Sequence, residues 1–424
     1  MSALASLALA VPLASEAADT REEIRGVFTG ARAARERKDY PAFLELSRRL
    51  LALAPRSTQA MAALARAEAL SSHPAEALAL LDRLAGMGVA VDLAADPDLQ
   101  SLPGKPGFDA VRQKMEALNA PVGKSTVAFT LPQEDLITEG IAHDPRTGAF
   151  FVSSIHRRKI VRVARDGTVR DFVGEGQDGL LSAVSLAVDA ERRLLWASSG
   201  ALPGMRGYKK EEEGRSFLVA YDLASGKLLR TIGPPAKATD ARLGDLTVAP
   251  TGDLYVSDPE SGRLYVLARG ASELQVMVEA GTLGSPQGLA VTPDGRWLFV
   301  ADYVRGIARI DPKSRSVSFL EAPDVALTGI DGLVLAGDSL VGIQNGIRPH
   351  KVLRLRLAPE KDRIAEVSTL EKANPHFDEP TLGVAVGREL FFVANSQWSH
   401  VRDDGTLDST HLKKPVILRT PLDW

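Results

Sequence analysis

Apolar and polar positions follow one pattern that occurs six times between residues 139 and 395. Each copy has a short apolar strand, a turn rich in Pro, Asp or Gly, and a second apolar strand ending in a small or polar residue. The copies begin 45, 60, 43, 44 and 51 residues apart, mostly close to the ~40–50 residues of one four-stranded propeller blade. The pattern predicts a mainly β protein with a six-bladed β-propeller over residues 124–424. The long interval contains an insertion, Gly200–Arg215.

The first copy predicts four strands, at residues 140–143, 150–153, 159–163 and 169–173, separated by turn residues. The last copy predicts only three, at residues 384–386, 390–394 and 415–419. An unpaired strand edge would remain there. We therefore expect Thr126–Leu131 to supply the fourth strand and close the ring.

Residues 19–119 have a different pattern, with apolar residues spaced three and four apart. It predicts a small all-α region with helices near 20–37, 41–54, 58–71, 74–86 and 107–118. Four pairs recur at a 33-residue offset: Ala34/Ala67, Pro41/Pro74, Ala42/Ala75 and Leu51/Leu84. This period resembles the tetratricopeptide repeat. Two roles remain open, a scaffold for a protein partner and a cap that packs on the propeller.

The N-terminus predicts a signal peptide over residues 1–18 and hence a periplasmic or secreted protein. Ala3–Leu13 is an apolar run of the right length, and Ser15-Glu16-Ala17 offers a cleavage site. No Lys or Arg precedes Arg21, so the usual basic start is missing. The alternative is a retained helix in a cytoplasmic protein. No later segment reaches the ~18 apolar residues that indicate a membrane span.

Charge and composition narrow the function classes. With 51 basic and 54 acidic residues the net charge is −3, which gives no reason to expect nucleic acid as a partner and favours a small-molecule ligand. The chain has no cysteine, so disulfides and thiolate metal sites are excluded. It also lacks the G-x-S-x-G, phosphate-loop, dinucleotide and H-E-x-x-H motifs of serine hydrolases, nucleotide enzymes and zinc proteases.

Oxygen-bearing side chains recur where each inner strand begins. In a propeller these positions ring one mouth of the central channel. In chain order they are Glu139, Val184, Gly244, Gln287, Asp331 and Leu382, with Asp245 one step further in. Carboxylates that converge in a narrow channel repel one another unless they are paired, and a hard divalent cation is the usual solution. Calcium fits this ligand set best.

The propeller resembles the senescence marker protein, gluconolactonase and regucalcin family. The resemblance lies in Glu139-Gly140 with the turn Asp144–Gly148, in Ser285–Ala290 before Pro293-Asp294-Gly295, and in Asp331-Gly332. It implies a divalent metal held by Glu139, Gln287 and Asp331, with Asp331 also activating water to hydrolyse a lactone. Two departures stand out. Gln287 stands where the family customarily has Asn, and Gly244 stands in the place of another customary Asn.

Further candidates lie in loops on the same face. His156 and His350 could shuttle protons or bind substrate, and Asp245, Asn345 and Trp398 could orient it. The alternative for these loop residues is ordinary solvation or turn chemistry. We expect His143 to have a packing role, and the insertion Gly200–Arg215 could form a lid.

The sequence thus favours an enzyme, a metal-dependent hydrolase of a lactone or related ester at the central channel. If the two amide departures abolish turnover, the propeller is instead a non-catalytic ligand- or protein-binding module with a helical scaffold in the cell envelope. A third alternative is a structural propeller whose carboxylates pair with Arg157, Arg305 or Arg348.

Overall fold

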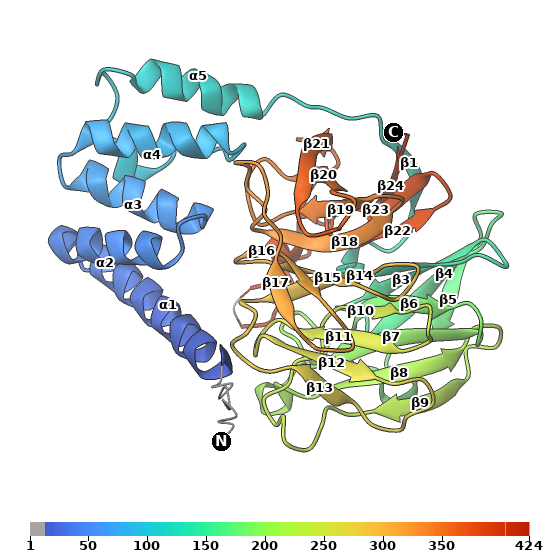
Figure 1. The fold of residues 1–424 in the computed structure, drawn as a ribbon. Coiled ribbons are helices and arrows are strands. Elements are labelled where there is room, and N and C mark those ends of the chain that lie inside the picture. The colour runs from blue at the N-terminus through green and yellow to red at the C-terminus, as the bar shows by residue number, and fades with distance from the viewer. Residues whose placement is uncertain (1–12, 403, 424) are drawn as a thin grey trace, which may run out of the picture.

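The computed structural model describes residues 13–402 and 404–423 and has two parts, a stack of helices and a β-propeller beside it (Figure 1). The helices are α1 (Leu13–Glu36), α2 (Tyr40–Leu53), α3 (Thr58–Leu70), α4 (Pro74–Gly86) and α5 (Phe108–Leu118). Five helices were expected here, and their bounds differ by a few residues, most at the start of α1. Within the described residues, no helix is long and apolar enough to cross a membrane.

Local signals explain where the helices begin. The Asp39 carboxylate accepts a hydrogen bond from the N–H of Ala42 and caps α2, and the Ser57 hydroxyl does the same for Ala60 in α3. Pro41 lies in the first turn of α2, where its missing N–H costs little. The proposed cleavage residues fall inside α1, whereas Ala3–Leu13 lies almost entirely outside the described residues. The signal peptide therefore stays a prediction.

Small residues allow the helices to pack closely. Ala34 and Ala67, one of the pairs at the 33-residue offset, are both fully buried in the same cluster with Phe43 and Leu64. Helix α1 contacts α2, and α3 contacts α4, as in successive helical hairpins. The assignment to tetratricopeptide repeats remains a prediction.

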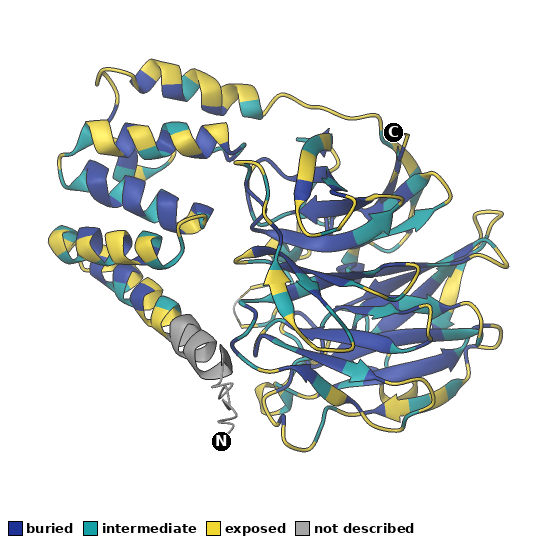
Figure 2. Ribbon diagram, viewed as in Figure 1, coloured by how far each residue is buried: buried dark blue, intermediate teal, exposed yellow. Residues whose placement is uncertain are grey.

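The described strands form six four-stranded antiparallel sheets, which confirms the six-bladed propeller. Blades one to three contain β2 (Ile141–Asp144), β3 (Ala149–Ser154), β4 (Lys159–Val163), β5 (Val169–Val173), β6 (Ser182–Asp189), β7 (Leu194–Gly200), β8 (Ser216–Asp222), β9 (Leu228–Ile232), β10 (Leu246–Val248), β11 (Leu254–Asp258), β12 (Arg263–Leu267) and β13 (Gln275–Val278). Blades four and five contain β14 (Pro286–Val291), β15 (Leu298–Asp302), β16 (Gly306–Ile310), β17 (Val317–Phe319), β18 (Ile330–Ala336), β19 (Ser339–Gln344), β20 (Lys351–Leu357) and β21 (Ile364–Lys372). Figure 2 shows that the middle strands are largely buried between neighbouring blades.

Blade six is completed by the first strand, as the sequence predicts. It contains β22 (Gly383–Val386), β23 (Glu389–Val393), β24 (Val416–Pro421) and β1 (Thr126–Thr130), in the order β1-β24-β23-β22. Strand β1 pairs antiparallel with β24, with Thr126 opposite Arg419 and Thr130 opposite Val416. Pairing the two ends of the propeller removes an open sheet edge and joins the ring.

An ion pair ties blade one to blade two at the turns that follow the inner strands. Both oxygens of Asp144 accept from the Arg193 guanidinium, at 2.6 and 2.7 Å, and Thr147 Oγ1 donates to Asp144 Oδ2. These donors hold the pKa of the Asp144 carboxyl well below its usual range, because they stabilise its charged form.

Replacing Asp144 with Asn should lower the free energy of unfolding by about 3 kcal/mol at pH 7, because the buried Arg193 pair is broken. A carboxyl with a depressed pKa contributes stability above its unfolded pKa of about 3.9, and this is lost as the pH falls further. Urea unfolding of the wild type and the Asp144→Asn variant should therefore show a smaller difference in the free energy of unfolding at pH 3 than at pH 7. A difference that stays constant would show that the charge of Asp144 is not its source.

Candidate active site

Glycines explain how the predicted ring residues come together. Glu139, Gln287 and Asp331 each precede a glycine that has no room for a side chain. A Cβ atom there would lie 2.5–2.6 Å from the backbone of the next blade: from Val184 O for Gly140, Asp331 O for Gly288 and Thr381 O for Gly332. Glycine at these three positions therefore lets adjacent inner strands approach closely.

The first and last blades meet at Glu139. The Thr381 hydroxyl donates to Glu139 O at 2.9 Å, and the Leu382 N–H lies 3.4 Å from the same oxygen. Between blades two and three, the N–H of Leu246 lies 3.4 Å from Ser185 Oγ. These contacts hold the ring positions of neighbouring blades against one another.

Three predicted acids form one electrostatic cluster. Burial, followed by the nearby charges of Asp331 and Asp245, raises the pKa of Glu139 well above its usual value. Burial and the charge of Asp331 do the same to Asp245, and burial raises the pKa of Asp331 to about 7. Within the described residues no ion pair joins Glu139, Asp245 or Asp331 to a basic side chain. Burial and mutual repulsion thus disfavour the charged forms of these three acids, and a bound cation would relieve that repulsion.

Sequence reasoning missed a fourth acid, Glu379. Its charge contributes to raising the pKa of Asp331, while burial and the charge of Asp378 raise the pKa of Glu379 itself. Glu379 lies in the segment between β21 and β22, three residues before the ring position Leu382. The sequence signal for Glu379 was its place shortly before Leu382, but this segment does not follow the pattern of the six copies.

Hydrogen bonds fix one oxygen of each of two carboxylates. Glu139 Oε2 accepts from the Ser396 hydroxyl at 3.0 Å and from the Trp398 indole N–H at 2.7 Å. Asp331 Oδ2 accepts from the Asn345 amide at 2.8 Å. In the part of the chain that the structure describes, these donors leave Glu139 Oε1 and Asp331 Oδ1 available to a ligand.

Several side chains here offer oxygens of the kind that a hard cation such as Ca²⁺ prefers. Glu139 and Asp331 offer carboxylate oxygens, and Gln287 offers an amide oxygen because its Nε2 donates to Ser285 at 3.3 Å. No group of three or more His, Asp or Glu side chains among the described residues is arranged to hold a metal ion, so the amide of Gln287 or water has to complete such a site. Gly244 offers no side-chain oxygen.

A cavity of about 340 Å³ lies between the six inner strands. Asp245 lines it near the start of β10, and His143 lines it toward the far end of β2. The His143 ring lies 4.8 Å from the ring of Phe150, and burial lowers its pKa. His143 is thus half-buried in the channel wall, away from the start of the strand.

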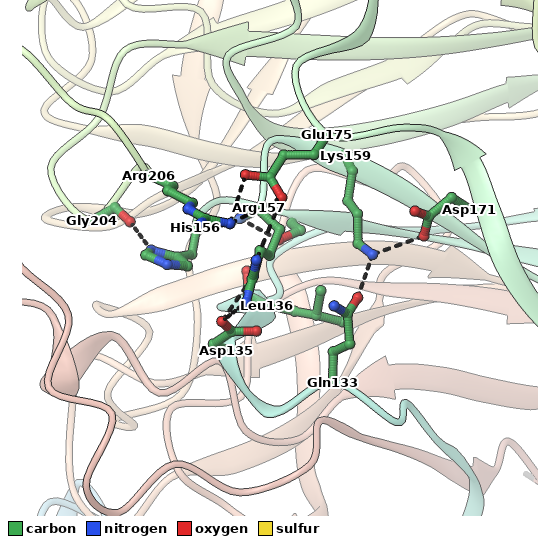
Figure 3. Close-up of polar contacts among 11 residues, drawn as sticks. Gln133, Asp135, Leu136, His156, Arg157, Lys159, Asp171, Glu175, Gly204 and Arg206 are labelled. Atoms are coloured by element: carbon green, nitrogen blue, oxygen red, sulfur yellow. Dashed lines mark hydrogen bonds and ion pairs between the residues drawn. The ribbon is translucent and has the colours of Figure 1, made fainter.

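His156 contacts the predicted lid. Its Nδ1 lies 2.6 Å from Gly204 O, and the Arg206 N–H donates to His156 O at 2.9 Å (Figure 3). Arg206 also pairs with Glu175, which lies beside Arg157. These contacts fasten the insertion to blade one.

The same insertion reaches the loop that carries Trp398. The Gly204 N–H donates to Gly405 O at 3.1 Å, and the ring of Tyr208 lies against Gly405. Segments from blades one, two and six therefore meet on the Glu139 side of the channel. A lid function for the insertion stays a prediction.

The remaining candidates divide into two groups. Trp398 and Asn345 are half-buried and join the acidic cluster, whereas His350 is buried beside Arg348, in a cavity of about 780 Å³ between blade five and the helices. Burial lowers the pKa of His350 to about 4. Sequence reasoning did not foresee that cavity, because it needs the helical region in place.

The three arginines considered as partners for the ring carboxylates have other neighbours. Arg157 pairs with Asp135, and Arg305 donates to Thr282 O and lies 4.0 Å from the centre of the Phe319 ring. Arg348 reaches the cluster only through Glu379, whose pKa its charge lowers. The alternative of a structural propeller with paired carboxylates thus has no support among these described contacts.

Comparison with known proteins identifies part of the propeller. Residues 137–335 match the family model described as the SMP-30/Gluconolactonase/LRE-like region. Adipocyte plasma membrane-associated protein of Rattus norvegicus is 32% identical over 88 residues, which are 20% of this chain and 23% of that protein. The match thus spans less than a quarter of that relative.

The chain is also similar to solved structures at low sequence identity. A gluconolactonase from Xanthomonas campestris is 19% identical, with a TM-score of 0.50 over 72% of this chain and 93% of that one. A calcium-binding regucalcin from Agrobacterium tumefaciens is 15% identical, with a TM-score of 0.48 over 69% and 93%. Residues 137–335 thus match the model of the SMP-30/Gluconolactonase/LRE-like family, and they lie within a six-bladed propeller that follows a helical region.

Proposed function

We propose that this protein hydrolyses a lactone or related ester at the channel mouth, with a divalent cation, best matched by Ca²⁺, held by Glu139, Gln287 and Asp331. The supporting observation is the cluster of carboxylates that has no basic partner among the described residues but keeps free oxygens. The cation would polarise the ring carbonyl and stabilise the charge that develops on its oxygen. The match of residues 137–335 to the SMP-30/Gluconolactonase/LRE-like family model supports the same chemistry.

Asp331 is our candidate base. Its Oδ2 is held by Asn345, so Oδ1 can accept a proton from a water that attacks the carbonyl carbon. As the ring C–O bond breaks, the leaving oxygen takes up a proton, which Asp331 can return. The products are one carboxylate and one hydroxyl on an opened chain.

Substrate contacts would come from the walls of the mouth. Trp398 is half-buried with its indole N–H on Glu139, so its ring can form an aromatic wall for a sugar-like or aryl lactone. Asp245 lines the cavity just below. His156 would act through the insertion that it holds. The prediction that His350 binds substrate stays untested.

The alternative function is a ligand- or protein-binding module. It is favoured by Gly244, which removes an amide, and by the longer side chain of Gln287. In that case the helical region would serve as a scaffold for a protein partner. A periplasmic or secreted location suits both functions and remains a proposal.

The test is hydrolysis of aliphatic, sugar and aryl lactones by the purified protein before chelation, after chelation and after return of Ca²⁺. We expect chelation to abolish hydrolysis and Ca²⁺ to restore it, in the wild type and in a control with the exposed Glu273→Gln. Glu139→Gln should stay inactive throughout. A folded wild type that hydrolyses none of these compounds would favour the binding module.

A further inference from the structure

We propose that Tyr303 and Asn345 position Asp331, and that the first turn of α3 holds these two residues in place. The helical region would then be part of the site and not only a scaffold or cap. The role of these residues in catalysis rests on the proposed function, whereas their contacts are observed independently of it.

The first step is a chain of two hydrogen bonds. The Tyr303 hydroxyl donates to Asn345 Oδ1 at 3.0 Å, and Asn345 Nδ2 donates to Asp331 Oδ2 at 2.8 Å. Both ends of the amide are used. A flipped amide would place its oxygen against the carboxylate, so the Tyr303 hydroxyl selects the orientation that supports Asp331. This assigns positioning, and not substrate binding, to Asn345.

The second step is the backbone that surrounds Tyr303. The Gly329 N–H donates to Tyr303 O at 2.7 Å, and the N–H groups of Asn345 and Gly346 lie 3.1 and 3.0 Å from Gly329 O. A Cβ atom on Gly346 would lie 2.5 Å from the Tyr303 ring and hydroxyl. Segments from blades four and five thus interlock tightly, and a shift of Gly329 would move Asn345.

The third step reaches the helical region. Thr58 Oγ1, in the first turn of α3, lies 3.1 Å from Thr328 Oγ1, and both residues are buried. Thr328 directly precedes Gly329. A cavity of only about 20 Å³ separates Ser57–Gln59 from Tyr303 and Gly346, so the turn of α3 packs closely on the Tyr303 segment.

Further hydrogen bonds join the helical region to the propeller. The Arg56 guanidinium donates to Pro323 O at 2.9 Å, and the Ala326 N–H donates to Met87 O at 3.1 Å. The Ala90 N–H donates to Arg348 O at 2.7 Å. The helices therefore hold both propeller segments that flank Asp331 in sequence, residues 320–329 and 345–350. Ala326 and Ile347 join the apolar core of the helical region.

The experiment compares Tyr303→Phe and Thr58→Val with matched controls. Tyr255→Phe changes a tyrosine inside blade three, and Thr29→Val changes an exposed threonine in α1. We would titrate each full-length protein with Tb³⁺ alone and follow luminescence excited through tryptophan, since the indole of Trp398 lies 2.7 Å from Glu139. The kcat and KM for the best lactone and the thermal midpoint would be measured in parallel.

Tyr303→Phe should weaken Tb³⁺ binding and lower kcat by about 10- to 100-fold, as is typical when the support of a metal ligand is lost, with little change in KM. Thr58→Val should act in the same direction but less, and both controls should match the wild type. Unchanged Tb³⁺ affinity and kcat in both test variants would overturn the inference. If the wild type hydrolyses no lactone, the proposed function fails, yet a weaker Tb³⁺ affinity in Tyr303→Phe would still support positioning.

Discussion

Asp331→Asn is expected to lower kcat/KM for lactone hydrolysis by at least about a thousandfold, because the change removes both the candidate base and one charged cation ligand. The protein should stay folded, since Asn has nearly the same shape and the change removes a negative charge from a crowded cluster. Steady-state kinetics with saturating Ca²⁺ would measure the first effect, and thermal unfolding would measure the second.

Asp338→Asn provides the matched control in the same blade. Asp338 is exposed in the turn between β18 and β19, at the opposite end of the strand that begins with Ile330 and Asp331. Its loss should leave hydrolysis within about twofold of the wild type, in line with the small effects of most surface changes. A fully active Asp331→Asn variant would remove Asp331 from the mechanism.

Glu371→Leu is expected to lower the free energy of unfolding by about 3–5 kcal/mol, because a buried carboxylate with many donors is lost. Glu371 is fully buried in β21 and accepts from the backbone N–H groups of Lys124 and Ser125 at 2.9 and 2.8 Å. Hydroxyls of Ser125 and Thr420 also donate to it, at 3.0 and 2.9 Å. It thereby fastens the chain just before β1, the strand that closes the propeller.

Urea unfolding would test this, with Glu366→Leu as the control on the same strand. Glu366 is exposed and pairs with Arg356 at the surface, so its replacement should cost no more than about 0.5 kcal/mol. Glu371→Gln should fall between the two, since its amide oxygen can still accept from the linker. Equal stability of the Glu371→Leu and Glu366→Leu variants would show that this carboxylate does not secure the ring.

Much of the fold was predictable because its signals are local and repeated. The alternation of apolar and polar residues defined β4 and β5 with their exact bounds, and the missing fourth strand of the last copy pointed to Thr126–Leu131. The spacing of apolar residues three and four apart placed the five helices. These features need only neighbouring residues, so a sequence is enough to find them.

The site was less predictable because its residues meet through long-range packing. The sequence predicts Asn345 as a substrate contact, which stays a prediction, but it does not show the two hydrogen-bond partners of Asn345, Tyr303 and Asp331, which come from different blades. The contact between Thr58 and Thr328 joins residues 270 positions apart, and neither residue belongs to a motif. Glu379 was missed for the same reason. Contacts of this kind depend on how the helices pack on the propeller. The spacing of apolar residues along the chain does not reveal that packing.

Two positions of this chain differ from the pattern that the family resemblance implies. Gln287 and Gly244 stand where the resemblance implies asparagines, and they change the oxygens offered to a cation. The acidic cluster remains, however, with Glu139, Asp245 and Asp331 coupled by their charges. A bound cation would relieve the repulsion among these carboxylates, which is the reason to expect one in spite of the lost amides.

Diffraction from crystals grown with Mn²⁺ and with Ca²⁺ would locate that cation most directly, through the anomalous signal of Mn²⁺ and the coordination distances of Ca²⁺. The account predicts one site at the channel mouth, with oxygens of Glu139, Gln287 and Asp331 about 2.3–2.6 Å from Ca²⁺ and no peak there in Glu139→Gln. A mouth that holds no cation at saturating concentration, with these three side chains bonded only to protein and water, would contradict it.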